Sequence, residues 1–279
     1  MQIALSIAGF DSSSGAGITA DLAVFSAHGL FGTAAITALT VQSTLGVREV
    51  GPTDPRLLAA TLDEIVFDLP PAGIKIGMLA TEQCVHVVAD FLERLLENRR
   101  VPVVLDPVLV SSSGKDLLEA AGVRALIARL LPMATWVTPN RREWAVLTDA
   151  DSLATGENAT IEQISRQIRQ RWPGTGFVVT GGDGDRADDL VLPPGCPPVW
   201  LRGEKIPGTS THGTGCAFSS AILCGLIQGL DGQAAAAAAK AYVGEAIRRA
   251  VPLGQGIGPM NLLWPLTKAS AQEQAATRN

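Results

Sequence analysis

Short apolar segments alternate with helix-forming segments along this chain, and that alternation constrains its fold more than any other feature. The apolar runs predict strands over 3–8, 33–41, 73–76, 101–105, 136–138 and 177–180, with a hairpin formed by 190–192 and 199–201. The helix-like segments run from 18 to Gly29, over 57–67, from Thr81 to 98, over 117–131, from Arg141, over 160–171, from Ala217 to Gly229 and over 233–249. Strands that alternate with helices build a parallel sheet covered by helices. We therefore expect an α/β fold with three α-β-α layers, a mostly parallel central sheet and a single domain over 1–264, then a polar, frayed tail over 265–279.

The composition agrees with this fold class and limits the kinds of partner that the protein can bind. Hydrophobic residues make up 47% of the 279 residues, which suits buried parallel strands. The net charge of −5 argues against nucleic acid as a partner, because nucleic-acid binding needs a basic patch. No apolar run approaches the ~20 residues that span a bilayer, and no signal peptide precedes the first strand-like segment. We expect a cytoplasmic protein without membrane contacts.

The cysteines and histidines argue against a metal site built from them. Cys84, Cys196, Cys216 and Cys224 show no metal-ligand spacing, and only three histidines are present. We expect reduced thiols, as in the cytoplasm.

A glycine loop over 209–216 carries the strongest chemical signal, because it runs directly into a helix. Gly213 and Gly215 allow a tight turn, since glycine tolerates positive φ. The first N–H groups of the helix lack internal partners and lie at the positive end of its dipole, so a phosphate fits there. Cys216 falls in the first turn, where we expect a lowered thiol pKa. The loop alone leaves open a simple glycine turn with a packed cysteine.

Other polar residues follow the predicted strands at their carboxyl ends, where ligands bind in open α/β sheets. Gln42 offers a donor and an acceptor for a heterocycle, although a solvated glutamine is the commoner case. Asn140 and Glu143 are interpreted as a helix cap or as ligands for hydrated Mg²⁺. The loop after the first strand lacks the G-x-G-x-x-G spacing of a dinucleotide site. Six loops would gather on one sheet edge, which indicates an enzyme: 9–17, 42–44, 106–114, 139–143, 180–184 and 209–216.

Six motifs in register resemble the hydroxymethylpyrimidine and phosphomethylpyrimidine kinases, within the ribokinase-like superfamily. They are GFDSSSGAGI at 9–18, ITALTVQ at 36–42, KIGML at 75–79, LDPV at 105–108, TPNRRE at 138–143 and HGTGC at 212–216. The matches extend over residues 3 to about 260 in the family's order, which is far more specific than any single motif. The resemblance implies a ribokinase-like fold and a homodimer, with an apolar flap at 41–52 as a contact. It also implies phosphorylation of 4-amino-5-hydroxymethyl-2-methylpyrimidine, and then of its monophosphate, by ATP with Mg²⁺ in thiamine diphosphate synthesis.

The resemblance also implies a role for individual residues. The pyrimidine would be bound by Gln42, Gly9, Asp11, Met78 and Val108. ATP would be bound by Asp106, Thr180, Gly182 and Thr214. Mg²⁺ would be held through water by Asn140 and Glu143. The anion hole would contain Gly213 and Gly215, with Cys216 in the place of the general base.

The chain also departs from the family's pattern. Thr180 and Gln255 stand where many members carry lysine, Ser14 replaces a usual glycine, and Ala23 stands at a frequent lysine. The acceptor of the second phosphorylation is already anionic, so the loss of two cations predicts that the first step is the better one. Two alternatives remain: a pyridoxal kinase of the same fold, and a nucleotide- or phosphate-sensing protein without turnover. Substitution of Cys216 by alanine separates a kinase from a sensor.

Overall fold

A computed structural model describes residues 1–111, 114–148, 158–182 and 184–267, so the expected tail lies outside the described residues from 268 onward. The strands are β1 (Ile3–Phe10), β2 (Phe31–Ser43), β3 (Gly46–Pro52), β4 (Gly73–Ile76), β5 (Val103–Leu105), β6 (Trp136–Val137), β7 (Gly176–Val179), β8 (Asp189–Leu192) and β9 (Val199–Leu201). The α-helices are α1 (Gly17–Ala27), α2 (Pro55–Asp68), α3 (Glu82–Asn98), α4 (Ala120–Ala125), α5 (Arg141–Thr148), α6 (Asn158–Arg171), α7 (Thr214–Ile227) and α8 (Gly232–Arg248). None of these helices has the length and apolar character needed to cross a bilayer.

The described strands form one sheet in the order β3-β2-β1-β4-β5-β6-β7-β8-β9. Strands β2, β1, β4, β5, β6 and β7 are parallel. By contrast, β3 at one edge and β8 and β9 at the other run antiparallel to their neighbours. The chain proceeds outward from β1 to β3 and then returns to place β4 on the other side of β1. In open α/β sheets ligands bind at such a reversal, outside the carboxyl ends of the strands. The topology therefore places a site after β1 and β4.

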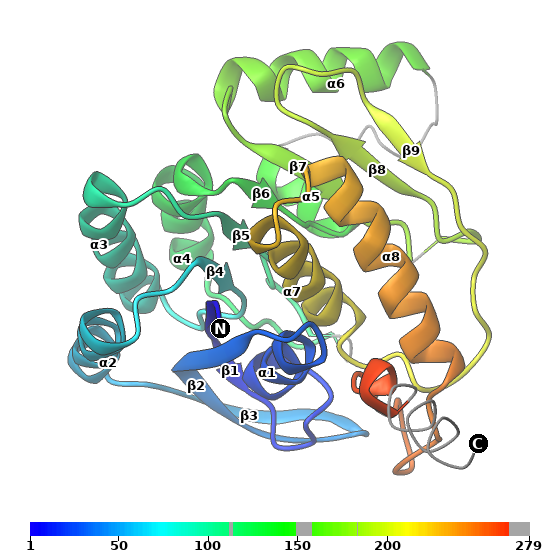
Figure 1. Cartoon of the computed structure of the whole chain (residues 1–279), viewed down its shortest axis with the longest axis horizontal. Coiled ribbons are helices and arrows are strands. Elements are labelled where there is room, and N and C mark those ends of the chain that lie inside the picture. The colour runs from blue at the N-terminus through cyan, green and yellow to red at the C-terminus, as the bar shows by residue number, and fades with distance from the viewer. Residues whose placement is uncertain (112–113, 149–157, 183, 268–279) are drawn as a thin grey trace, which may run out of the picture.

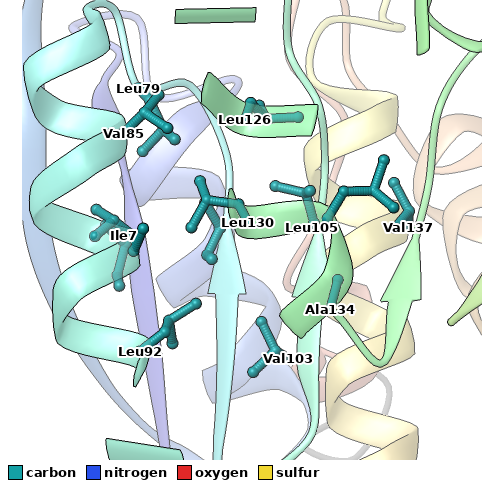
Figure 2. Close-up of a cluster of buried hydrophobic side chains, with 14 of the residues drawn as sticks. Ile7, Leu79, Val85, Leu92, Val103, Leu105, Leu126, Leu130, Ala134 and Val137 are labelled. Carbon is teal, nitrogen blue, oxygen red and sulfur yellow. The ribbon is translucent and has the colours of Figure 1, made fainter. Parts of the chain in front are cut away.

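Helices cover both faces of the sheet, as Figure 1 shows, and each face has its own core. Helices α2 to α6 cover one face, with buried side chains such as Leu92, Trp144 and Phe177. Figure 2 shows part of this core, where labelled side chains from α3 gather against those from β1, β5 and β6. Helices α1, α7 and α8 cover the other face, where many side chains are small. The predicted three-layer α/β fold with one mostly parallel sheet is confirmed.

One local expectation was wrong, and one strand was not predicted. The segment expected to be a flap, 41–52, consists of the end of β2 and the whole of β3, and the mostly exposed edge position of β3 leaves no apolar run for a sequence pattern to detect. The helix expected over 117–131 begins only at Ala120 and continues after α4 as a π-helical turn (Leu126–Leu130) and a 3₁₀ turn (Leu131–Met133). Pro132 within the last turn has no N–H to donate to a regular α-helix.

The described helices begin in two different ways. Asp54, Thr81 and Asp231 each accept a backbone N–H at the start of α2, α3 and α8, as N-cap residues do. By contrast, no side chain caps α1 or α7. Their first N–H groups therefore remain available to other partners.

Candidate active site

Two loops meet at the site that the topology indicates, namely residues 11–17 after β1 and residues 212–216, which we call the anion loop. Gly213 has φ +79°, and a Cβ there would collide with the carbonyl oxygen of Gly15. A Cβ on Gly15 would in turn collide with the ring of His212. The close packing of the two loops therefore requires glycine at both positions.

Asp11 organises the first loop. Its carboxylate accepts the N–H groups of Ser13, Gly15 and Ala16, and it also lies 2.8 Å from His212 Nε2. Burial alone would raise the pKa of Asp11, but the contacts with His212 and Ser13 outweigh it and lower the pKa. The structure thus places Asp11 at the predicted site as the residue that shapes the loop.

His212 connects this loop to Gln42, the residue expected to read the heterocycle. Gln42 Nε2 lies 2.9 Å from His212 Nε2, the nitrogen that also contacts Asp11. The sequence placed His212 in the HGTGC motif but indicated no role for it, because its partners Asp11 and Gln42 are distant in the chain.

A small apolar cluster lies beside Gln42, separate from both cores. Its buried members are Ala38, Met78 and Leu117, and four half-buried side chains pack against them: Val47, Val50, Ala80 and Val108. A Cβ on Gly9 would lie 3.2 Å from the Met78 sulphur, and Gln42 pairs with Val47 across β2 and β3. The structure therefore brings Gly9, Met78 and Val108 together, and β3 adds a wall that the sequence did not indicate.

The thiol of Cys216 lies where the two uncapped helices meet. Cys216 is in the first turn of α7, and its sulphur accepts the N–H of Gly17 at the start of α1. The expected lowering of the thiol pKa is nevertheless wrong: burial raises the pKa of Cys216 to about 12. Lys75 opposes this shift, but the nearby carboxylates of Asp106 and Asp21 reinforce it. Burial inside a folded network thus outweighs the helix terminus.

A buried polar network lies behind Cys216. Lys75 Nζ is 3.0 Å from both oxygens of Asp21 and 3.9 Å from Asp106 Oδ2. Ser219 donates to Asp106 Oδ2 at 3.1 Å. Asp106 was expected to bind ATP. Its carboxyl faces Lys75 and Ser219 and lies beneath the anion loop, 4.0 Å from where a Cβ of Gly215 would be. Nothing in the sequence indicated a role for Lys75 or Asp21.

Asn140 and Glu143 form the cap that was one of the two expectations for them. Asn140 Oδ1 accepts the N–H groups of Arg142 and Glu143, while Glu143 Oε2 accepts the N–H of Asn140 at 2.9 Å. Glu143 Oε1 lies 3.5 Å from the N–H of Leu109. Within the described ranges, no group of three or more His, Cys, Asp or Glu residues could hold a metal ion. Mg²⁺ keeps several waters and takes one or two carboxylates plus phosphates, so these oxygens fit a hydrated ion carried by a nucleotide.

The remaining nucleotide-binding candidates come from two segments, the end of β7 and the start of α7. Thr180 follows β7 and pairs with Asn140, and its N–H donates to the carbonyl of Pro139 at 2.9 Å. Gly182 is exposed in the next loop, and Thr214 is the first residue of α7. Ser14, which replaces a usual glycine, has φ 59°, the left-handed region that glycine adopts without strain.

The fold and the anion loop together define a class, the ribokinase-like α/β kinases. The comparisons with known proteins agree with this class and narrow it. The family model described as phosphomethylpyrimidine kinase matches residues 11–261. The chain belongs to the phosphomethylpyrimidine kinase family.

The relatives include proteins named for two different activities. A hydroxymethylpyrimidine/phosphomethylpyrimidine kinase of Synechococcus elongatus is 40% identical over 268 residues, which cover 95% of this chain and 99% of the relative. A solved phosphomethylpyrimidine kinase from Clostridium difficile 630 is 31% identical, with a TM-score of 0.75 over 88% of this chain and 100% of that one. A solved ADP complex of Bacillus subtilis pyridoxal kinase is also 31% identical, with a TM-score of 0.80 over 93% and 96%. The fold is therefore common to kinases of two heterocycles.

Proposed function

We propose that this chain is an ATP-dependent kinase of 4-amino-5-hydroxymethyl-2-methylpyrimidine, and of the resulting monophosphate, in thiamine diphosphate synthesis. One observation carries the proposal: Gln42, beside the Met78 cluster, contacts His212 of the anion loop at 2.9 Å. Gln42, which can hydrogen-bond to a pyrimidine, thus contacts a residue of the loop that can bind a phosphate. The curated relative with 40% identity supports the same activity.

The site supplies what phosphoryl transfer to an alcohol needs. A hydroxymethyl oxygen is a poor nucleophile until its proton leaves, and the phosphoryl group needs positioning and charge neutralisation. In the proposed reaction the N–H groups at the start of α7 receive the phosphoryl group. The hydroxyl proton passes to the Cys216 sulphur as the oxygen attacks the γ-phosphorus, and the thiol gives its own proton to a neighbouring carboxylate. The bond from phosphorus to the bridging oxygen breaks, and its electron pair leaves on ADP. Glu143 and Asn140 would hold Mg²⁺ through water, and the ion would neutralise phosphate charge.

The decisive assay offers hydroxymethylpyrimidine and pyridoxal in separate reactions with ATP and Mg²⁺ and identifies the products by mass spectrometry. We expect the pyrimidine phosphates to be the dominant products. Pyridoxal phosphate as the dominant product would assign the chain to the alternative substrate. ADP binding without turnover of either compound would identify a sensor.

The second phosphorylation is proposed to be slower than the first. Thr180, beside Asn140, is a short neutral side chain, and the backbone N–H of Gln255 lies 3.2 Å from Thr44 Oγ1. Neither position offers a cation to an acceptor that already carries a phosphate. We expect kcat/KM for the monophosphate to rise in Thr180→Lys while kcat/KM for the alcohol changes little. Equal rates for the two steps in the wild-type chain would contradict this proposal.

The protein is proposed to act as a homodimer through β2 and the turn to β3. Leu39, Val41 and Leu45 are exposed there by 57%, 48% and 70%, and a second copy would cover this apolar strip. We expect light scattering to give a dimer mass for the wild-type chain and a monomer mass for Leu39→Glu. Phe67→Glu, at an exposed side chain on α2, is the matched control and should remain dimeric.

A cytoplasmic location is part of the proposal. All four cysteines are free thiols, and a reducing compartment maintains them in that state.

A further inference from the structure

Lys75 is a fully buried lysine close to the anion loop. Ile74 and Ile76 on either side of it belong to the core under α2 to α6, so Lys75 points to the opposite face, toward α1 and α7. There Nζ contacts both oxygens of Asp21, and Ser6 and Ser220 donate to the same carboxylate at 2.5 and 2.8 Å. Each oxygen of Asp21 therefore has two donors, and the ion pair is complete without any ligand.

Asp106 lies on the other side of Lys75, between this pair and the thiol. Its carboxyl lies 3.9 Å from Lys75 Nζ and accepts a bond from Ser219 at 3.1 Å. The Cys216 side chain is hydrogen-bonded to the same carboxyl. The charged and titratable groups that face the Cys216–Asp106 pair are Lys75 of β4 and Asp21 of α1, together with the Gly17 N–H dipole. Asp106 is thus a carboxyl in contact with the thiol that can take its proton.

We propose that Asp106 receives the proton of the substrate hydroxyl through Cys216, and that the Lys75–Asp21 pair holds Asp106 in position for this transfer. The proposal rests on the kinase function stated above. The hydroxyl proton moves to the Cys216 sulphur as the thiol proton moves to an Asp106 oxygen. The substrate oxygen forms a bond to the γ-phosphorus, the bond to the bridging oxygen breaks, and the electron pair stays on ADP. Asp106 then returns the proton to water through the open site.

Electrostatics supports this direction of transfer. Burial raises the pKa of Cys216 to about 12, so the resting group at neutral pH is a thiol, which cannot act as a base alone. Burial also raises the pKa of Asp106, although Lys75 opposes the shift, so this carboxyl takes up a proton more readily than an exposed aspartate does. A relay from thiol to carboxyl therefore avoids a half-buried thiolate beside the carboxylates of Asp106 and Asp21.

The first test is Asp106→Asn, which keeps the shape of the side chain and removes its ability to accept a proton. We expect kcat to fall by roughly 10²- to 10⁴-fold, as for the loss of a general base, with KM for ATP and pyrimidine within about threefold. The acid limb of the kcat/KM profile, which reports Asp106 in the wild-type enzyme, should disappear. A kcat within about threefold of wild type, a retained acid limb, or a large rise in KM for ATP with kcat unchanged would each overturn the proposal.

A second readout does not depend on turnover. Iodoacetamide labelling mapped by mass spectrometry follows Cys216 against pH, with exposed Cys196 as an internal reference and buried Cys224 as an unreactive thiol. We expect the labelling midpoint of Cys216 to shift in Asp106→Asn while that of Cys196 stays constant. An unchanged Cys216 midpoint would overturn the relay. If the wild-type chain phosphorylates neither heterocycle, the proposed function fails, and this midpoint still decides whether thiol and carboxyl share a proton.

The role of the ion pair is tested with both charges removed together, because a single substitution leaves a lone buried charge. In Lys75→Met/Asp21→Leu we expect kcat to fall about tenfold and the acid limb to move to higher pH, because Lys75 lowers the Asp106 pKa more than Asp21 raises it. Arg94→Met/Asp63→Leu removes an exposed pair between α2 and α3 and should leave kcat and the profile unchanged. An acid limb at the wild-type pH in the Lys75 double variant would show that the pair does not position Asp106.

Discussion

The two faces of the central sheet are equally well buried but differ in chemistry. Under α2 to α6, which we call the apolar face, the core consists almost entirely of hydrocarbon and aromatic side chains. Under α1, α7 and α8, the polar face, fully buried polar groups lie among small apolar ones: Ser6, Asp21, Lys75, Ser219 and Ser220. Burial alone therefore does not distinguish scaffold from site. The difference is that one face stabilises the fold by excluding water, whereas the other holds charges in a fixed arrangement next to the anion loop.

The polar face satisfies its own hydrogen bonds. Among the described residues, the buried side-chain polar atoms without a partner are Thr138 Oγ1 and Trp144 Nε1, and neither belongs to this network. Buried polar groups that lack partners are rare in folded proteins because each one loses the solvation that water gave it. The completeness of the network explains how the fold tolerates two carboxylates and an ammonium group beneath its active site.

The largest expected effect comes from breaking the polar face at Lys75. In Lys75→Met the Asp21 carboxylate loses its counter-charge, and we expect the free energy of unfolding to fall by about 3–5 kcal/mol. Adding Asp21→Leu should restore most of that loss, since a matched apolar pair is often as stable as a buried ion pair. Urea denaturation of both variants measures this. A double variant no more stable than the single one would show that the ion pair itself stabilises the fold.

A substitution on the apolar face should lower stability without changing catalysis. Leu92→Ala leaves a cavity under α3, and we expect a loss of about 3 kcal/mol in unfolding free energy with kcat unchanged at a temperature where the variant is folded. Urea denaturation and the kinase assay measure the two quantities. A large change in kcat would mean that the two faces are mechanically coupled. Leu92→Met, which roughly conserves volume, is the control and should cost less.

A smaller effect is expected at the capped start of α8. Asp231 accepts the N–H of Ala234 at 2.8 Å, so Asp231→Ala should cost about 1 kcal/mol and leave kcat unchanged. Asp231→Asn keeps an N-cap acceptor and should be nearly neutral. Thermal unfolding compares the two. An equal loss in both variants would point to the carboxylate charge rather than the cap.

The smallest effect is a pH dependence on the polar face. His28 packs 4.7 Å from the Tyr242 ring, and burial lowers its pKa below the ordinary 6.5, although its bond to Val24 opposes the shift. The unfolded chain then binds more protons than the folded chain, so stability is full above pH 6.5 and declines as pH falls through the folded-state pKa. His28→Gln should flatten this decline in denaturation curves between about pH 7 and 5. An identical slope in both proteins would exclude His28 as its source.

The order of elements was predictable because buried parallel strands are continuous apolar runs. β4 and β5 are buried along their whole length, and Thr81 caps α3 as its sequence position indicated. β3 was missed because an edge strand needs no apolar run. The anion loop and the cap formed by Asn140 and Glu143 could also be predicted from the sequence, since both depend on residues close together in the chain.

The buried polar network of the polar face could not be predicted from the sequence, because it depends on contacts between segments that are distant in the chain. A lysine usually indicates exposed surface, and the counter-ion of Lys75 lies 54 residues earlier in the chain. The one signal was its place between Ile74 and Ile76 in a strand expected to be buried. The prediction of a lowered Cys216 pKa was wrong for the same reason. Its neighbours Lys75 and Asp106 come from β4 and from the residue after β5, far from Cys216 in the chain.

The uncapped start of α7 has a consequence for how the protein responds to heat. Helices α2, α3 and α8 carry their own side-chain caps, whereas no side chain caps α7, so an anion bound at the proposed site would give its N–H groups a further partner. Occupancy of the site is therefore linked to the melting temperature, by RT ln(1 + [L]/Kd) for a ligand that binds only the folded state. The melting temperature measured with ADP, with inorganic phosphate and with neither ligand therefore reports whether this helix end is occupied, without any need for catalysis.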